Sequence, residues 1–176
     1  MRDIWVISDT HFGHENIIRY CDRPFASARE MDEAMVENWN RVVKDGDIVY
    51  HLGDVYFGQH GRVLDRLRGR KRLVLGNHDT IDPYMHAHFQ KITVWRMFPE
   101  FGLLLTHVPV HPRVFEEEHS SGRRGKYDVN VHGHIHQQTV MLRDKWTVPD
   151  KRYRCVSVEH TSYAPVNIEE LRTRGG

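Results

Sequence analysis

The sequence predicts an α/β protein, and three features of the chain indicate this fold class. Short apolar runs rich in β-branched residues recur along its 176 residues. In the first half they alternate with segments of helical periodicity, which is typical of a buried, largely parallel sheet. In the second half they mostly follow one another without helices, which predicts antiparallel additions. A chain of this length buries a real core, so we expect residues 1–176 to form a single domain.

Seven apolar runs are predicted to be strands. They cover residues 3–8, 47–52, 72–76, 102–107, 129–133, 139–143 and 154–158.

Three segments between these runs are predicted to be helices. Residues 27–30, Ser-Ala-Arg-Glu, have the spacing of a capping box, and apolar residues then recur every three or four positions from Met31 to Val43. A shorter amphipathic helix with Val63 and Leu67 on its apolar face is expected before Gly69, and a third over residues 82–90.

The charge balance limits the kinds of partner. Lys and Arg total 25 and Asp and Glu total 24, so a net charge of +1 gives no general attraction to nucleic acid or to an anionic membrane. The arginine-rich run 62–72 is interpreted as the solvated face of a helix rather than a nucleic-acid patch. No spanning helix or signal peptide is indicated, so we expect a cytoplasmic protein with no membrane partner. Cys21 and Cys155 lack a CxxC pairing and are expected to be reduced thiols.

Polar residues follow five of the predicted strands. The carboxyl ends of strands in an open α/β sheet meet at one edge, so we expect these side chains to lie together. The pairs Asp-x-His at 9–11 and His-x-His at 134–136 each place two ligands on one side of an extended segment. The side chains of metal-ligating type at these strand ends are Asp9, His11, Asp54, Asn77, His78, Asp79, His107, His134 and His136.

Glycines precede three of these residues. Gly53, Gly76 and Gly133 stand directly before Asp54, Asn77 and His134. We expect each glycine to form a tight turn that keeps a side chain out of the metal's way.

The order DTH, GD, GNHD, TH and GHIH resembles the calcineurin-like metallophosphoesterases, from residue 1 to about residue 160. The resemblance implies two mixed β-sheets packed as a sandwich flanked by helices, with a site for two metals. It further implies that Asp54 bridges the metals and that His78 stays free for catalysis. One departure is Phe57, at a position where many relatives carry an acidic residue. The implied ligands are Asp9, His11 and His136 for one metal and Asn77, His107 and His134 for the other.

The expected chemistry uses two divalent cations, of Mn, Fe, Ni or Zn. Such a pair, about 3.5 to 4 Å apart, supplies a bridging hydroxide that attacks phosphorus in line. His78, if protonated, donates to the leaving oxygen, and Asp79 could orient its ring. His14 is a candidate substrate contact. Arg123 and Arg124 could bind the phosphate if the long loop 112–128 covers the metals.

These observations favour a phosphoesterase that hydrolyses small phosphodiesters or phosphomonoesters. The alternatives are a metal-dependent nuclease and a non-catalytic metal-binding scaffold module of the same fold. The complete ligand set together with His78 favours the enzyme, and near-neutral charge without an added domain disfavours a dedicated nuclease. The physiological substrate, the native metal and the oligomeric state stay open.

Overall fold

The computed structural model describes residues 2–58, 62–115 and 127–172. The strands are β1 (Ile4–Ile7), β2 (Ile48–His51), β3 (Arg70–Val74), β4 (Phe89–Thr93), β5 (Trp95–Phe98), β6 (Leu103–Thr106), β7 (Val129–His132), β8 (Met141–Leu142), β9 (Lys145–Pro149), β10 (Tyr153–Cys155) and β11 (Val166–Asn167). The helices are α1 (Glu15–Tyr20), α2 (Ala28–Val42) and α3 (Pro83–His88), with short 3-10 segments η1 (Val63–Arg66), η2 (Pro99–Phe101), η3 (Pro112–Phe115), η4 (Val158–His160) and η5 (Ile168–Leu171).

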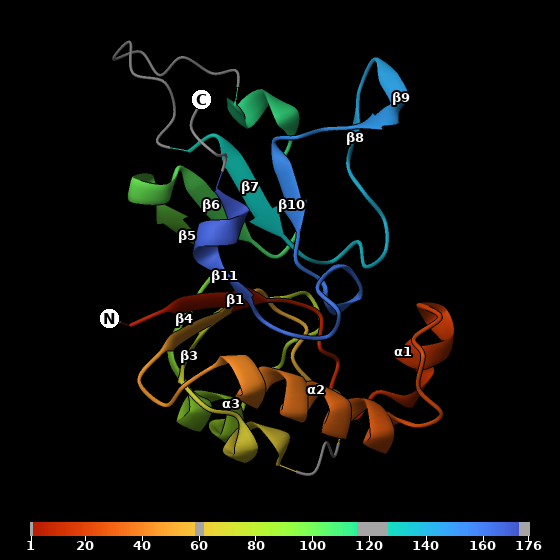
Figure 1. Cartoon of the computed structure of the whole chain (residues 1–176), viewed down its shortest axis with the longest axis vertical. Coiled ribbons are helices and arrows are strands. Elements are labelled where there is room, and N and C mark those ends of the chain that lie inside the picture. Colours follow the sequence, from red (N-terminus) through yellow and green to blue (C-terminus); the bar gives the residue numbers. More distant parts are fainter. Residues whose placement is uncertain (1, 59–61, 116–126, 173–176) are drawn as a thin grey trace.

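Two mixed sheets form the body of the molecule. The first has the order β11-β1-β2-β3-β4 and the second the order β10-β7-β6-β5. Only β11 in the first and β5 in the second run antiparallel to their neighbours. Helices α2 and α3 lie on one side of the first sheet, and the second sheet lies on its other side (Figure 1). The predicted sandwich of two mixed sheets flanked by helices is therefore confirmed.

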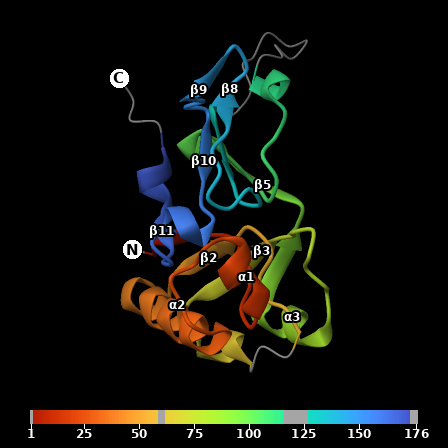
Figure 2. The same ribbon diagram turned by 90° about the vertical axis from the view of Figure 1, so that its right-hand side faces the viewer.

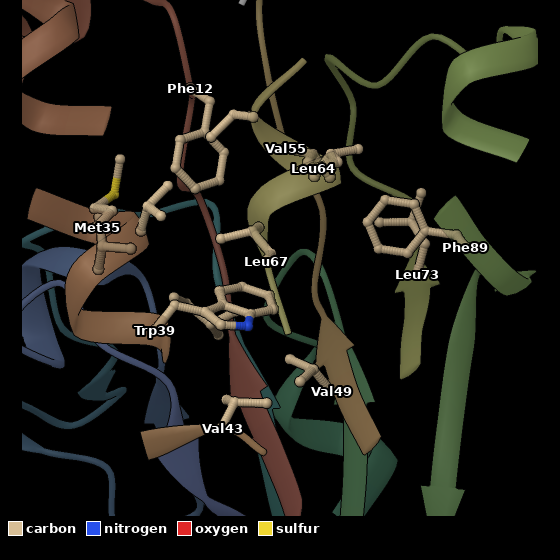
Figure 3. Packing of buried hydrophobic residues seen from close by; sticks show 14 of the residues in the cluster. Phe12, Met35, Trp39, Val43, Val49, Val55, Leu64, Leu67, Leu73 and Phe89 are labelled. Atoms are coloured by element: carbon tan, nitrogen blue, oxygen red, sulfur yellow. The ribbon is translucent and has the colours of Figure 1, made fainter. Parts of the chain in front are cut away.

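The alternation of side chains along the strands divides the core into two layers. Val49 and Leu73 point toward the helices and pack with Trp39 of α2 (Figure 3). Their neighbours Tyr50 and Val74 point the other way and pack against the second sheet. Each large buried apolar side chain contributes about 1.5 to 3 kcal/mol, so both layers favour one register of the strands.

Helix α2 begins where the capping-box spacing predicts. The hydroxyl of Ser27 accepts a hydrogen bond from the backbone N–H of Glu30 at 3.2 Å. The Glu30 carboxylate in turn accepts one from the backbone N–H of Ala26 at 2.8 Å. These two bonds satisfy backbone donors that have no partner within the helix, and they fix its first turn.

The expectation of antiparallel strands in the second half is wrong for its central strand. β7 pairs in parallel with both β6 and β10. Parallel neighbours need long connections, and the chain supplies them in residues 107–128 and 133–152. The second of these contains the β8–β9 hairpin, which forms a sheet of its own at the end of the molecule farthest from α2 (Figures 1 and 2).

The helix expected before Gly69 is a 3-10 turn, η1, because β3 begins at Arg70 and leaves no room for more turns. The third expected helix ends at His88, and strand β4 begins at the next residue, Phe89. Helix α1 and strands β4, β5, β9 and β11 were not predicted.

Two arginines of the basic run 62–72 are paired with acidic groups. Arg66 forms a salt bridge with Glu33 at 2.6 Å, and Arg62 forms one with Asp65 at 2.6 Å. This supports its interpretation as a solvated face. Within the described residues, no helix has the length and apolar character needed to cross a bilayer.

Candidate metal centre

The seven candidate ligands gather where the carboxyl ends of strands from both sheets meet. Among these candidates, two groups of side chains each place all their ligand atoms within 4.8 Å of one another, and a further group of this kind joins Cys21 and Glu159 to His136. The first group comprises Asp9, His11 and His136, and the second comprises Asp54, His107 and His134. The loops after β1 and β7 supply the first group, and those after β2, β6 and β7 supply the second.

Asp54 lies between the two groups. Its Oδ2 is 3.6 Å from Nε2 of His11 and 3.6 Å from Nε2 of His107. Its Oδ1 accepts a hydrogen bond of 3.0 Å from the backbone N–H of His78. Asn77 joins the second group, since its Oδ1 lies 2.8 Å from Nε2 of His107.

Orphaned acceptors show that these residues fit cations. Nδ1 of His107 donates to the carbonyl of Leu52 at 2.7 Å, so its Nε2 carries a lone pair that faces the amide oxygen of Asn77. Two facing acceptors repel unless a cation lies between them. Asp9 Oδ1 and His11 Nε2 are buried and have no hydrogen-bond partner among the described residues. Oxygen and imidazole donors suit first-row divalent metals, so the donor set fits such ions.

Asp9 shows how the protein leaves one oxygen available. Its Oδ2 accepts from the hydroxyl of Ser157 at 2.8 Å and from the backbone N–H of His134 at 2.9 Å. These two donors come from the second half of the chain, so they also fix the β1 loop against the β7 loop. Oδ1 is left to point into the site.

Five of the seven candidates adopt left-handed backbone conformations. Left-handed φ is strained for residues other than glycine, and such strain persists only where surrounding contacts enforce it. Its concentration on these side chains indicates that the loops are shaped to aim them. The five are Asp9 (φ 57°), His11 (φ 50°), Asp54 (φ 56°), His134 (φ 70°) and His136 (φ 49°).

The glycines between strands and candidates are required by close packing. A Cβ on Gly133 would overlap the side chains of Ser8 and Asp9, and a Cβ on Gly76 would overlap Asp54. Gly53 has φ of 96° and lies against Gly76. The glycines are therefore needed for the close approach of neighbouring loops, and their role in keeping a side chain away from a metal stays a prediction.

His136 is held by a buried ion pair that the sequence motifs did not reveal. Its Nδ1 lies 3.1 Å from Oε1 of Glu159. Arg23 donates to the same oxygen at 2.8 Å and to the backbone carbonyls of Asp9 and Thr10. Although burial disfavours the charged ring, hydrogen bonds to Cys21 and Glu159 raise the pKa of His136 to about 10. The surroundings thus favour positive charge at this position.

Burial shifts the pKa of two further candidates, His11 and Asp54. It lowers the pKa of His11, helped by the nearby charge of Arg23, so the ring is neutral and able to bind a metal. It raises the pKa of the Asp54 carboxyl, with Asp9 and Asp79 adding repulsion. A cation beside Asp54 would relieve that repulsion.

Asp79 has a different role from the one expected. Its carboxylate accepts hydrogen bonds from the backbone N–H groups of Asp54 (3.0 Å), Val55 (2.9 Å) and Gly76 (2.8 Å). In the described part of the chain, none of its hydrogen bonds goes to the ring of His78. Asp79 therefore fastens the loop after β2 to the loop after β3, and we revise the expectation that it orients the imidazole.

His78 and His14 both line a pocket beside the candidate ligands, with a volume of about 580 Å³. The His78 side chain is exposed there, 6.2 Å from the His11 ring centroid. His14 stacks on Phe57 at 4.2 Å, and Phe57 stacks on His11 at 5.2 Å. The aromatic residue that replaces the acidic one thus packs a candidate ligand. Arg123 and Arg124 lie outside the described residues.

His51 forms a second buried connection between loops, and the sequence motifs did not reveal it. His51 accepts from the backbone N–H of Gly53 at 3.2 Å, and its Nε2 contacts the Thr10 hydroxyl at 2.9 Å. This joins the β1 and β2 loops. Of the missed residues, Glu159 directly follows the predicted strand 154–158. This position at a strand end was the only feature of the sequence that could have pointed to it.

Comparison with known proteins places the chain in a family. The model for the calcineurin-like phosphoesterase superfamily domain matches residues 1–150. The chain is 33% identical over 181 residues to the uncharacterized protein MJ1445 of Methanocaldococcus jannaschii, covering 96% of this chain and 89% of that protein. It is 31% identical over 172 residues to the Gene 66 protein of Mycobacterium phage L5, covering 81% and 82%.

Among solved structures, the fold is similar to that of AQ665 from Aquifex aeolicus, a protein of unknown function. The TM-score is 0.72 at 28% identity, and the match covers 97% of this chain and 98% of that one. With the family model matching most of its length, this chain belongs to the calcineurin-like phosphoesterase superfamily.

Proposed function

We propose that the protein is a dinuclear metal-dependent phosphodiesterase. The position of Asp54 carries the proposal, because one carboxylate oxygen lies at equal distances of 3.6 Å from imidazole nitrogens of the two ligand groups. A carboxylate so placed is suited to bridge two cations. Asp9, His11 and His136 would hold one ion, and Asn77, His107 and His134 the other.

The chain's own residues would position the phosphate and move a proton. When bound, the two cations supply Lewis acidity and an acidified water as nucleophile. His78 stands at the pocket wall with an exposed ring, where it can donate a proton to the leaving oxygen. Its backbone N–H donates to Asp54, so the segment that carries the ring is held next to the carboxylate proposed to bridge the metals.

The surroundings of the centre fit a diester better than a monoester. Among the described residues, no lysine or arginine lines the 580 Å³ pocket beside His11 and His136. The second charge of a monoester dianion would find no lysine or arginine among these lining residues to pair with. A further pocket of about 370 Å³ adjoins Asn77 and His107 on the other side. Space on both sides of the centre suits a phosphate with two ester groups.

The test is a metal-resolved assay. Protein reconstituted with Mn, Fe, Ni or Zn should hydrolyse bis(4-nitrophenyl) phosphate faster than 4-nitrophenyl phosphate, and it should hold close to two ions per chain by elemental analysis. Asp54→Ala should lose both ions, whereas His11→Ala should keep the one bound by the second group. Full metal content and activity in Asp54→Ala would disprove the bridging role, and a preference for the monoester would disprove the diester assignment.

A further inference from the structure

The pocket beside the centre has a second wall that the metal ligands do not explain. One wall carries His11, His134 and His136, and the other is formed by Ile17 and Tyr20 of α1. Figure 1 shows α1 at the side of the molecule, apart from α2 and α3. This short helix adds nothing to the ligand set, and core packing explains the buried Ile17 but not the exposed Tyr20.

The second wall is uncharged. Ile17 is apolar and Tyr20 is aromatic. The thiol of Cys21 lies next to them in the lining, and none of the described residues that line the pocket is Asp, Glu, Lys or Arg. A charged ligand group would be desolvated there without a partner. The wall therefore fits a neutral organic group attached to the phosphate rather than a second phosphate or a carboxylate.

Aromatic rings continue from the metal ligands to the pocket mouth. Phe57 stacks on His14 with ring centroids 4.2 Å apart, and the Tyr20 ring meets His14 edge-on at 6.4 Å. Tyr20 is 64% exposed, unusually open for a large ring, and the Arg19 guanidinium lies 5.8 Å from its centroid. These contacts orient the Tyr20 ring in advance, which reduces the entropy lost when a ligand stacks on it.

Amide groups lie beside the rings. Gln137 and Gln138 line the same pocket and are exposed. Neither side-chain amide makes a hydrogen bond within the described part of the chain. An amide offers both donors and an acceptor, which match the edge of a nucleobase. Rings to stack on and amides to bind an edge are a combination suited to a planar heterocycle.

We propose that this pocket binds one ester group of the substrate, a nucleoside whose base stacks on Tyr20 and is hydrogen-bonded by Gln137 or Gln138. The inference rests on the proposed function, since it assigns the substrate class of the same site. It also makes Tyr20 a specificity residue with no part in holding the metals.

Binding tests the pocket separately from hydrolysis. Calorimetry on the metal-loaded protein would compare the methyl ester of adenosine 5′-phosphate, butyl methyl phosphate and dimethyl phosphate, three diesters with poor leaving groups. The nucleoside diester should bind at least about tenfold more tightly than the other two, in the range of base–aromatic stacking. Tyr20→Ala should abolish most of this advantage and Tyr20→Phe should keep it. Trp146→Ala, which removes an aromatic ring that is 82% exposed on β9, should change nothing.

Three results would overturn the inference. They are equal binding of all three diesters, binding of the butyl ester as tight as that of the nucleoside ester, and an unchanged preference in Tyr20→Ala. Metal content and turnover of bis(4-nitrophenyl) phosphate, measured on the same samples, report on the proposed function. Intact turnover with no nucleoside preference would reject the pocket assignment alone, whereas absent turnover with two bound metals would reject the enzyme.

Discussion

Nδ1 of His136 lies 3.1 Å from Oε1 of Glu159, in a pair whose acidic member is almost fully buried. A carboxylate in this position fixes the tautomer and the rotation of a metal-binding imidazole, and its removal typically weakens metal affinity about 10- to 100-fold. Glu159→Gln should therefore weaken one of the two bound metals by about that factor and leave the other unchanged. Competition titration with a chromophoric chelator measures both. Glu169→Gln, a substitution in an exposed pair with Arg172, is the matched control. Equal weakening of both metals would indicate a general loss of structure.

The His78 ring stands at the pocket, and the proposed mechanism uses it as a proton donor. His78→Ala should keep two metals yet lose about two to four decades of kcat on a diester with an alkyl leaving group, the usual range for general acid catalysis. With nitrophenolate as leaving group the loss should shrink, because little protonation is needed. An equal loss on both substrates would assign the ring to stabilising the phosphoryl oxygens. Loss of metal would place His78 among the ligands.

Gly133 allows the β7 loop to approach Ser8 and Asp9, and a Cβ there would overlap both. Gly133→Ala should lower the free energy of unfolding by about 1 to 3 kcal/mol, the usual range for overpacking. Thermal unfolding of the metal-free protein measures this without interference from bound ions. Gly46→Ala is the matched control, because a Cβ at Gly46 meets nothing within 4 Å. If both variants melted together, the close approach at Gly133 would have no energetic consequence.

Asp32 of α2 supports the loop after β1 by accepting a hydrogen bond from the backbone N–H of Gly13. Burial raises the pKa of Asp32 to about 6, from an ordinary value of 3.8, and the Gly13 bond only partly opposes this. The folded protein thus holds this proton more tightly than the unfolded chain does. Protonated Asp32 contributes to the free energy of unfolding in full below pH 3.8, and this contribution is lost as the pH rises through about 6.

Asp32→Asn should therefore gain stability relative to the unsubstituted protein as the pH rises from about 4 to about 7, measured by urea unfolding. Glu33→Gln is a control of opposite sign. The hydrogen bond from Arg66 lowers the pKa of Glu33, so this variant should lose stability at neutral pH rather than gain it. Parallel profiles for Asp32→Asn and the unsubstituted protein would show that Asp32 titrates normally.

The parts of the fold that local sequence patterns encode could be predicted. Helix α2 followed from its capping box and apolar periodicity, and β1, β2 and β3 followed from buried β-branched runs. Strands β4 and β9 could not be found in the same way, because β4 is largely exposed and β9 is wholly exposed, which removes the apolar signal. The parallel pairing of β7 depends on how long connections cross the sheet, which no local pattern shows.

In the site too, residues in local sequence motifs could be predicted, whereas contacts between distant parts of the chain could not. Asp9, His11, Asp54 and the other candidates stand in short motifs directly after strands, so their meeting could be expected. Arg23 and Glu159 are 136 positions apart and belong to no motif, yet their ion pair of 2.8 Å is buried beside His136. Such a pair exists only once the chain has folded, so a structure was needed to find it.

The candidate ligands are divided between the two sheets, and this has a mechanical consequence. Asp9, His11, Asp54 and Asn77 follow strands of the first sheet, whereas His107, His134 and His136 follow strands of the second. Each cation would therefore act as a non-covalent cross-link between halves of the sandwich, in addition to their apolar layer and the hydrogen bonds from His134 and Ser157 to Asp9. Chelation should allow the halves to separate more readily, so backbone amides of β6 and β7 should exchange with deuterium faster in chelator while those beneath α2 change less. At a free metal concentration of 100 times the dissociation constant, one such ion would add about 2.7 kcal/mol to the free energy needed to separate the two halves of the sandwich.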